Sequence, residues 1–331
     1  MLSFRIESGR LCNPARCALL ATLAVLVATP CSAEVRMTTY TYKKVGDLEI
    51  KADVYRDEGD QTQPVLVWLH GGALIMGNRA GIDRRFKKEF AGNGYILVSI
   101  DYRLAPETPL PEIIADVEDA FRWVREKGPA LLHADPDRLA VAGGSAGGYL
   151  TLTAGFRVKP RPVALVPLFG YGDLLAPWYN EPSPHPRHNQ SKVSREEALA
   201  QVSGAPIADD RDRKGNGGKF YVYCRQQGAW PLGVSKWDPK TTPEKFFPYM
   251  PIKNVTPDYP PTFLIHGDHD TDVPHSESVR MAAELEKNKV DHKLVILENG
   301  EHGFGGADPK KVDAAYEEAF AFLKTRLARS K

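Results

Sequence analysis

Ser145 is the residue of this sequence whose surroundings first suggest chemistry, a single hydroxyl among the glycines of VAGGSAGGYL, residues 141–150. It sits in a G-x-S-x-G pattern between a strand-like and a helix-like segment, where a sharp turn can lift a serine above a sheet. The amide of Ala146 would then lie at a helix N-terminus and could donate to an oxyanion. A phosphate-binding loop is the alternative, but no Lys-Ser or Lys-Thr follows the glycines and the G-x-G-x-x-G spacing is absent. The pattern therefore predicts a nucleophile, with a purely structural serine as the remaining alternative.

A serine hydroxyl needs a base, because it is barely nucleophilic while protonated. Among the nine histidines we take His302 as the candidate, since it lies in ENGEHGFGG just after the last strand-like segment. An acid must then orient the histidine, and HGDHDTDVP, residues 266–274, offers Asp268, Asp270 and Asp272. We take Asp270 as this acid, which gives the chain order Ser, Asp, His. The other two aspartates are expected to cap the turn or the following helix.

An oxyanion hole requires a second donor, from the loop after an earlier strand. The segment LHGGALIMG, residues 69–77, follows the strand-like run at 64–70. Glycines allow backbone amides to approach a ligand with no Cβ in the way. We expect Gly72 and Ala73 to donate and Gly71 to shape the loop. An ordinary Gly-rich turn is the alternative, and the serine turn and the histidine loop weigh against it.

His185 and His188, in HPRH, are the pair that could suggest a metal site. A metal site would need a cysteine or a cluster of carboxylates nearby, and none accompanies this pair. We interpret both histidines as residues of a loop surface. We therefore predict neither a metal nor a cofactor.

The elements that must position these residues alternate between strand and helix from about residue 39. Alternation of apolar and polar residues predicts a half-exposed strand at 48–55,. Short apolar segments predict further strands at 64–70, 95–102, 138–144, 162–168, 261–267 and 292–298,. Helical spacing predicts helices at 82–94, at 111–128 (stopped by Gly128-Pro129), from Ala146, at 275–288 and at 309–329,. Such alternation predicts an α/β fold, with a mostly parallel sheet of about eight strands and helices on both faces.

Residues 171–258, called here the cap segment, break this alternation with many Pro, Gly and aromatic residues. So long a loop without structure of its own would be improbable in a compact domain, so we expect an inserted cap or lid over the edge of the sheet. Its aromatic residues could line an acyl or sugar-ester pocket or could form a small core of their own. The residues concerned are Tyr171, Trp178, Tyr179, Tyr221, Tyr223, Trp230 and Trp237.

The segments HGGALIMG, DYRLAPE (101–107), GGSAGG and EHGF occur in an order and at spacings that resemble the α/β-hydrolase superfamily. More narrowly, they are similar to the hormone-sensitive-lipase-like carboxylesterases, over about residues 40–329. The resemblance implies that DYRLAPE supports the oxyanion loop without taking part in the chemistry. The segment from Gly267 to Pro274 resembles prolyl-oligopeptidase-like and dienelactone-hydrolase-like members, and this likeness also selects Asp270 as the acid. HGGA stands here where the family usually has HGGG, and the cap segment carries no family motif.

The N-terminus reads as a secretory signal peptide. Three arginines precede the apolar run at 18–28, and a small-x-small site predicts cleavage after Ala33,. The run is shorter than the roughly 20 residues of a membrane span, and Pro30 disfavours a lipoprotein anchor at Cys31. Cleavage would leave Cys224 as the one cysteine, which we expect to be a packing residue. We therefore expect secretion or a periplasmic location, without stable membrane insertion.

Together these features predict a secreted serine carboxylesterase that hydrolyses small esters through an acyl-enzyme. Export together with an aromatic cap would fit acetyl or feruloyl esters of polysaccharides. The formal net charge of +1 provides no field that would recruit nucleic acid,, and the oligomeric state is left open. A prolyl-oligopeptidase-like exopeptidase and a non-catalytic binding protein of the same fold are the alternatives. The former usually carries a large N-terminal propeller, for which about fifteen residues between Ala33 and the first predicted strand leave no room.

Overall fold

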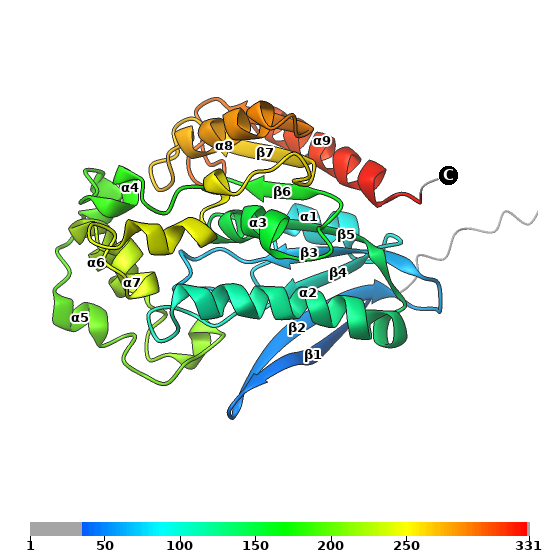
Figure 1. Cartoon of the computed structure of the whole chain (residues 1–331), viewed down its shortest axis with the longest axis horizontal. Coiled ribbons are helices and arrows are strands. Elements are labelled where there is room, and N and C mark those ends of the chain that lie inside the picture. Colours follow the sequence, from blue (N-terminus) through cyan, green and yellow to red (C-terminus); the bar gives the residue numbers. More distant parts are fainter. Residues whose placement is uncertain (1–34, 330–331) are drawn as a thin grey trace, which may run out of the picture. The chain divides into compact units, whose positions relative to one another are not determined.

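The structure is a computed structural model, and it describes residues 35–329. Its strands are β1 (Val35–Val45), β2 (Leu48–Asp57), β3 (Gln63–Leu69), β4 (Ile96–Ile100), β5 (Ala134–Gly144), β6 (Leu165–Leu168), β7 (Thr262–Gly267) and β8 (His292–Leu297). They form one sheet in the order β1-β2-β4-β3-β5-β6-β7-β8 (Figure 1). β2 pairs antiparallel with β1 and with β4, and all other pairings are parallel. The predicted mostly parallel sheet is confirmed.

The central strands consist of the short apolar runs seen in the sequence. All residues of β3, β4, β6 and β7 are buried. A strand covered on both faces needs apolar side chains on both, so its sequence shows a continuous run instead of alternation. All seven strands predicted from the sequence are present.

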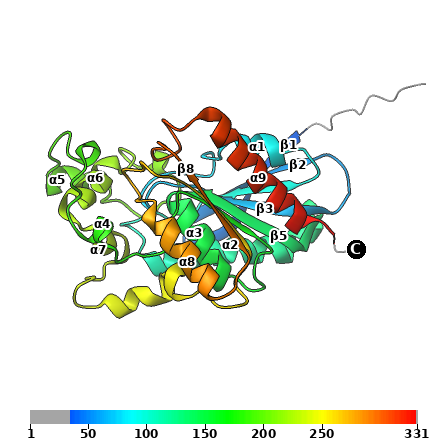
Figure 2. The ribbon, with the colours of Figure 1, turned by 90° about the horizontal axis from the view of Figure 1, so that it is seen from above.

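Helices cover both faces of the sheet (Figure 2). α1 (Arg84–Phe90) and α9 (Pro309–Leu327) pack on one face. α2 (Leu110–Leu132), α3 (Ala146–Arg157) and α8 (Ser276–Lys287) pack on the other. The two hydrophobic clusters so formed are separated by the sheet itself.

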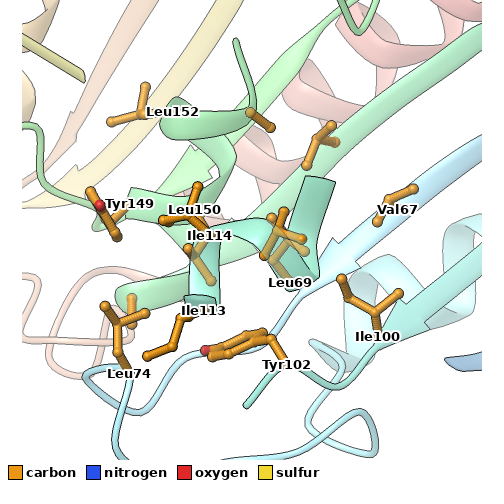
Figure 3. Packing of buried hydrophobic residues seen from close by; sticks show 14 of the residues in the cluster. Val67, Leu69, Leu74, Ile100, Tyr102, Ile113, Ile114, Tyr149, Leu150 and Leu152 are labelled. Carbon is orange, nitrogen blue, oxygen red and sulfur yellow. The ribbon is translucent and has the colours of Figure 1, made fainter. Parts of the chain in front are cut away.

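The cluster beneath α2 and α3 holds the start of α3 in place (Figure 3). Val67 and Leu69 of β3 and Ile100 of β4 pack there with Ile113 of α2 and Leu150 of α3, and all five are essentially inaccessible to solvent. Burial of such a side chain contributes about 1.5–3 kcal/mol. This packing fixes the helix that begins directly after Ser145.

β1 is a strand that the sequence analysis did not predict. Its segment, VRMTTYTYKKV, is mostly polar, and its residues are exposed or half-buried. β1 is an edge strand, paired with β2 along nearly its whole length. Its backbone hydrogen bonds to β2, and not an apolar run, make it a strand.

α2 extends beyond the predicted stop at Gly128-Pro129. It continues to Leu132 and ends at His133, which has a left-handed conformation with φ 54° and donates its amide to the Gly128 carbonyl. Leu132 is buried, and Gly128 lies close to the Ala134 side chain. Tertiary packing at these positions outweighs the helix-breaking tendency of Pro129.

The cap segment lies between β6 and β7, beside the ends of the parallel strands, at the left of Figure 1. It contains only short helices, namely α4 (Pro177–Asn180), α5 (Arg195–Leu199), α6 (Gly218–Gln227) and α7 (Trp230–Ser235). Four 3-10 turns accompany them, at Pro186–His188, Asp210–Asp212, Pro243–Tyr249 and Pro251–Lys253. Short helices without long apolar stripes explain why the sequence showed no clear periodicity here.

Two predictions concern the N-terminus and the membrane. The predicted signal peptide, residues 1–33, lies outside the described residues, and so export stays a prediction. Within residues 35–329, no helix combines the length and the apolar character that crossing a membrane requires.

Candidate active site

Ser145 forms the turn between β5 and α3 and has the unusual backbone angles φ 57° and ψ −120°. A left-handed φ at a residue with a side chain costs about 1–3 kcal/mol and is found most often at functional sites. The turn is pressed against β3, since a Cβ added to Gly147 would lie 2.0 Å from the Leu69 carbonyl oxygen. The Ser145 hydroxyl does not cap α3 and makes no hydrogen bond to any residue of 35–329. The fold thus presents a serine whose hydroxyl is not engaged elsewhere.

The loop after β3 has three consecutive residues with positive φ: Gly72 at 107°, Ala73 at 57° and Leu74 at 63°. Ala73 thus adopts the left-handed conformation despite its Cβ, at the position where the family usually has glycine. The amides of Gly72 and Ala73 have no hydrogen-bond partner among the described residues. Two predicted oxyanion donors therefore remain unpaired, as an oxyanion hole requires.

This loop borders the serine turn. A Cβ added to Gly71 would lie 3.3 Å from the Cβ of Ser145. Ala146 is the first residue of α3, so its amide has no acceptor within the helix,. The amides of Gly72, Ala73 and Ala146 thus come from two segments that adjoin Ser145.

The DYRLAPE segment supports this loop. The Tyr102 hydroxyl donates to the His70 carbonyl at 2.8 Å, the two rings stack at 4.1 Å, and the Ala105 amide donates to the Leu74 carbonyl at 2.8 Å. Burial lowers the pKa of His70 to about 4, although the Gly71 carbonyl opposes this shift. Neutral His70 can therefore donate Nδ1–H to Gly71, 2.8 Å away. These contacts agree with the supporting role that the resemblance implies.

Asp270 and His302 are in contact. The His302 Nδ1 lies 2.7 Å from the Asp270 Oδ2, and the Asp270 Oδ1 accepts the amides of Asp272 and Val273. Burial alone would raise the pKa of Asp270, but its hydrogen bonds to His266 and His302 outweigh burial and lower it to about 2. Asp270 is therefore a carboxylate at neutral pH, as a group that orients a histidine must be.

Phe169, just after β6, connects the serine turn with the histidine loop. Its amide donates to the Ile265 carbonyl at 2.7 Å, and its φ is 37°. A Cβ added to Gly144 would lie 2.9 Å from the Phe169 ring, and the same ring meets the His302 ring edge-on at 4.7 Å. Gly144, which precedes Ser145, and His302 thus both lie against the Phe169 ring.

Asp272 does not cap a turn or helix through its side chain, and the expectation for it was wrong. Its Oδ1 accepts hydrogen bonds from the cap segment, from the Tyr221 hydroxyl at 2.5 Å and from the Arg225 Nη1 at 2.9 Å. Its Oδ2 lies 3.9 Å from the Nε2 of His302. The one feature of the sequence that could have indicated these contacts is the presence of Asp272 two residues after Asp270. No pattern around Arg225 indicated that it would bind Asp272.

The interpretation of His188 as a loop-surface residue was also wrong. Its side chain is only 3% exposed, and its ring nitrogens contact Ser183 Oγ at 2.8 Å and Asp272 Oδ1 at 2.9 Å. His185 caps the turn at Pro186–His188 by accepting the Arg187 amide. His188 thus belongs to the group of side chains that hold Asp272.

The aromatic residues predicted to bind substrate pack mainly against one another. Tyr171 and Tyr179 are fully buried, whereas Trp178 is half-buried. Tyr171 stacks on Tyr149 of α3 at 5.1 Å, and Tyr179 stacks on Trp230 at 4.0 Å. This packing favours the alternative in which the aromatic residues form a small core of the cap segment.

The cap segment also contacts the oxyanion loop, which sequence reasoning missed. The Trp230 Nε1 donates to the Ala73 carbonyl at 3.0 Å. Arg213 donates to the Ile75 carbonyl and, at 2.9 Å, to the Glu107 carboxylate. The loop that carries the unpaired amides is thus held from the cap segment as well as from the DYRLAPE segment.

Two family models match different parts of the chain. Residues 66–214 match a family described as alpha/beta hydrolase fold. Residues 202–330 match the prolyl oligopeptidase family. The second match contains Asp270 and His302, in agreement with the likeness seen in the Asp loop.

Curated relatives include larger proteins. A non-reducing polyketide synthase of Preussia isomera is 27% identical over 81% of this chain. Another, of Stereocaulon alpinum, is 35% identical over 42% of it. This chain spans only 12% and 6% of their respective lengths.

Solved structures share the fold. An alpha/beta hydrolase superfamily protein of Enterococcus faecalis has a TM-score of 0.68 at 24% identity, over 88% of this chain and 99% of that one. A truncated carbohydrate esterase from gut microbiota has a TM-score of 0.63 at 20% identity, with 91% and 99% covered. An acetyl ester-xyloside bifunctional hydrolase of Caldicellulosiruptor lactoaceticus has a TM-score of 0.62 at 18% identity, with 90% and 98% covered.

Proposed function

Since this chain has the α/β-hydrolase fold, we propose that it is a serine carboxylesterase with Ser145, His302 and Asp270 as its triad. The observation that carries this proposal is the 2.7 Å contact between His302 and a buried, ionised Asp270, on a loop linked through Phe169 to the serine turn. A carboxylate in this position holds the imidazole in the tautomer whose Nε2 can accept a proton.

In the proposed reaction, the Ser145 oxygen attacks the ester carbonyl while the His302 Nε2 takes its proton. The tetrahedral intermediate collapses when His302 returns this proton to the departing alcohol, which leaves an acyl-serine. Water then attacks the acyl group by the same steps and releases the acid. The negative charge of both intermediates would be held by the amides of Gly72, Ala73 and Ala146.

The replacement of Ser145 by alanine tests this proposal. We expect Ser145→Ala to reduce kcat for p-nitrophenyl acetate by about 10⁴-fold or more, because no other group in the site can form the acyl-enzyme. Ser203→Ala, at an exposed position of the cap segment, is the matched control and should keep full activity. Appreciable hydrolysis by the Ser145→Ala protein, or no labelling of the unaltered protein by a fluorophosphonate, would contradict the proposal.

For the substrate, we propose small esters of sugars or polysaccharides, including acetyl esters. Two structural neighbours, a carbohydrate esterase and an acetyl ester-xyloside hydrolase, support this class. Release of acetate from acetylated xylan, compared with the hydrolysis of p-nitrophenyl acetate, measures it directly. Cleavage of the small ester with no acetate released from xylan would reject the polysaccharide as substrate.

An exopeptidase is the second candidate, and the match of residues 202–330 to the prolyl oligopeptidase family favours it. Both candidates would use the same triad, so inactivation of Ser145 does not separate them. A panel of aminoacyl p-nitroanilides against p-nitrophenyl esters does. We expect hydrolysis of the esters to exceed that of the anilides.

We also propose that the protein is exported and cleaved after Ala33. The support is the order of arginines, apolar run and small residues in the first 33 positions,. The N-terminal sequence of the protein recovered from the culture medium or the periplasm would begin at Glu34 if the proposal holds.

A further inference from the structure

Asp272 is a second carboxylate beside His302, on the side opposite Asp270. Asp270 contacts the Nδ1 of the ring at 2.7 Å, whereas the Asp272 Oδ2 lies 3.9 Å from the Nε2. In the proposed reaction, Nε2 is the nitrogen that delivers a proton to the departing alcohol. Asp272 therefore lies where the alcohol part of an ester would leave.

The two oxygens of Asp272 have different surroundings. Oδ1 accepts hydrogen bonds from His188 Nε2 at 2.9 Å, Tyr221 Oη at 2.5 Å and Arg225 Nη1 at 2.9 Å. Oδ2 accepts none from residues 35–329, and the side chain keeps 13% of its surface exposed. The carboxylate is thus held firmly at one oxygen and offers the other as an acceptor.

This acceptor carries charge at neutral pH. Burial alone would raise the pKa of Asp272, but the hydrogen bond from His188 and the charges of His302 and Arg225 hold it well below its usual value. A hydrogen bond to an ionised acceptor is about twice as strong as one between neutral groups. A hydrogen-bond donor on the substrate that reaches Oδ2 would therefore increase the affinity for that substrate measurably.

The spacing fits a hydroxyl on the carbon next to the one that bears the ester oxygen. The ester oxygen must come within about 3 Å of Nε2 to receive its proton. In a vicinal arrangement, the second oxygen lies about 3 Å from the first, and a hydrogen bond to a carboxylate spans about 2.7 Å. The ester oxygen and the neighbouring hydroxyl can therefore contact Nε2 and Oδ2 at the same time, since these two atoms lie 3.9 Å apart.

We propose that the Asp272 Oδ2 binds a free hydroxyl vicinal to the scissile ester, so that the enzyme prefers partial esters of polyols and sugars. This inference rests on the proposed esterase function and adds a residue that determines specificity for the alcohol part. In each turnover Asp272 accepts a hydrogen bond and transfers no proton. His302 alone moves the proton.

The charge balance favours a neutral hydroxyl over a cationic group. The Arg225 guanidinium pairs with Asp272 and is itself buried, with 3% of its side chain exposed. It lies over the rings of Trp178 and Tyr179, at 5.3 and 5.2 Å from their centroids. Because this pair is neutral overall, it attracts a substrate cation weakly while still accepting a hydrogen bond.

The test compares three acetates that differ only at the second carbon of the alcohol. 2-Hydroxyethyl acetate offers a donor, 2-methoxyethyl acetate has a similar shape without a donor, and acetylcholine has a cation without a donor. We expect kcat/KM for the hydroxyl ester to exceed that for the methoxy ester by about five- to tenfold. In Asp272→Ala the ratio should fall to about one, while any general effect on His302 cancels in the ratio.

Tyr221→Phe is the matched control, because it removes one donor to Oδ1 and leaves the Oδ2 acceptor in place. Its ratio should stay within about twofold of that of the unaltered protein. Asp272→Asn, which keeps the shape of the side chain, serves if the alanine variant does not fold, and its ratio should fall as well, because a neutral amide accepts more weakly.

Three outcomes would overturn the inference: a ratio near one in the unaltered protein, a preference for acetylcholine, or a ratio that survives the loss of the carboxylate. Each of these leaves the esterase proposal intact as long as Ser145→Ala abolishes the hydrolysis of p-nitrophenyl acetate. The inactivity of the unaltered protein toward every ester would instead contradict the proposed function itself.

Discussion

His70 shows at the scale of one residue how burial controls charge. It follows β3, is 1% exposed, and its Nε2 has no partner among the described residues. Burial lowers its pKa to about 4, against an ordinary value of 6.5. The ring is therefore neutral at neutral pH, and its Nδ1–H remains available to the Gly71 carbonyl at the base of the oxyanion loop.

This shift predicts acid sensitivity. Between pH 6.5 and 4 the unfolded chain binds a proton at His70, whereas the folded protein does not. Proton binding favours the unfolded chain, so the unfolding free energy decreases as the pH falls from 6.5 toward 4. The full loss is about 3 kcal/mol of unfolding free energy. Urea titrations across this range should show a shallower decline for His70→Asn than for the unaltered protein.

His133→Asn is the control for the pH prediction. His133 is partly exposed and has φ 54°, a left-handed conformation that asparagine also adopts. The slope of stability against pH for His133→Asn gives the effect of losing a partly exposed histidine, and the slope for His70→Asn is compared with it. Equal slopes for His70→Asn and the unaltered protein would show that His70 is not the group responsible.

At the scale of elements, the cap segment and the oxyanion loop meet at α7. The Trp230 Nε1 donates to the carbonyl of Ala73, whose own amide is a proposed oxyanion donor. Ala73 and Leu74 both have positive φ, and such a conformation persists only when its surroundings hold it. We interpret Trp230 as a positioning residue of the loop.

Trp230→Phe keeps an aromatic ring and removes the hydrogen bond. We expect kcat for p-nitrophenyl acetate to fall about tenfold or more, with KM changed less than about twofold, because a displaced oxyanion donor affects the transition state more than the bound ester. Trp237→Phe, in the same segment but packed against Phe246 and Tyr249, should have little effect. A change in KM alone would indicate a pocket residue instead.

At the scale of the whole molecule, the cap segment is joined to the α/β core by buried polar contacts. Arg225 pairs with Asp272 in the Asp loop. Arg213 pairs with Glu107 of DYRLAPE, and only 3% of the Arg213 side chain and 2% of the Glu107 side chain are exposed. Removal of one partner from a buried pair leaves an uncompensated charge. The core and the cap segment are thus expected to unfold together.

Glu107→Gln tests this coupling, because it leaves Arg213 buried without its counter-charge. We expect a loss of about 3–5 kcal/mol in unfolding free energy, followed in urea by circular dichroism and by tryptophan fluorescence. Three of the five tryptophans, Trp178, Trp230 and Trp237, lie in the cap segment, so the two probes report different regions. Coincident transitions support one cooperative unit.

The exposed pair of Lys219 and Glu197 provides the comparison for this experiment, with about half of each side chain accessible. Glu197→Gln should leave the unfolding free energy nearly unchanged, because water screens an exposed ion pair. An early fluorescence transition at unchanged ellipticity would mean that the cap segment unfolds by itself.

The sequence alone determined the parallel sheet, the turn at Ser145 and the candidates Asp270 and His302. Each of these depends on local information: apolar runs that must be buried on both faces, a Gly-rich turn between strand and helix, and polar residues directly after a strand. Secondary structure was predicted wrongly at two places, where strand pairing or packing outweighed local propensity. These are the polar edge strand β1, which was missed, and α2, which continues past Pro129.

Only the tertiary structure decided what surrounds these residues. Arg225 and His188 reach Asp272 across 47 and 84 residues, and Trp230 reaches Ala73 across 157. No local pattern encodes such contacts, because they arise when a segment of short helices folds back onto the ends of the strands. The same folding buries Tyr171 and Tyr179 in a core, one of the two alternatives that the sequence left open. It also brings a second carboxylate to His302, which spacing could not predict.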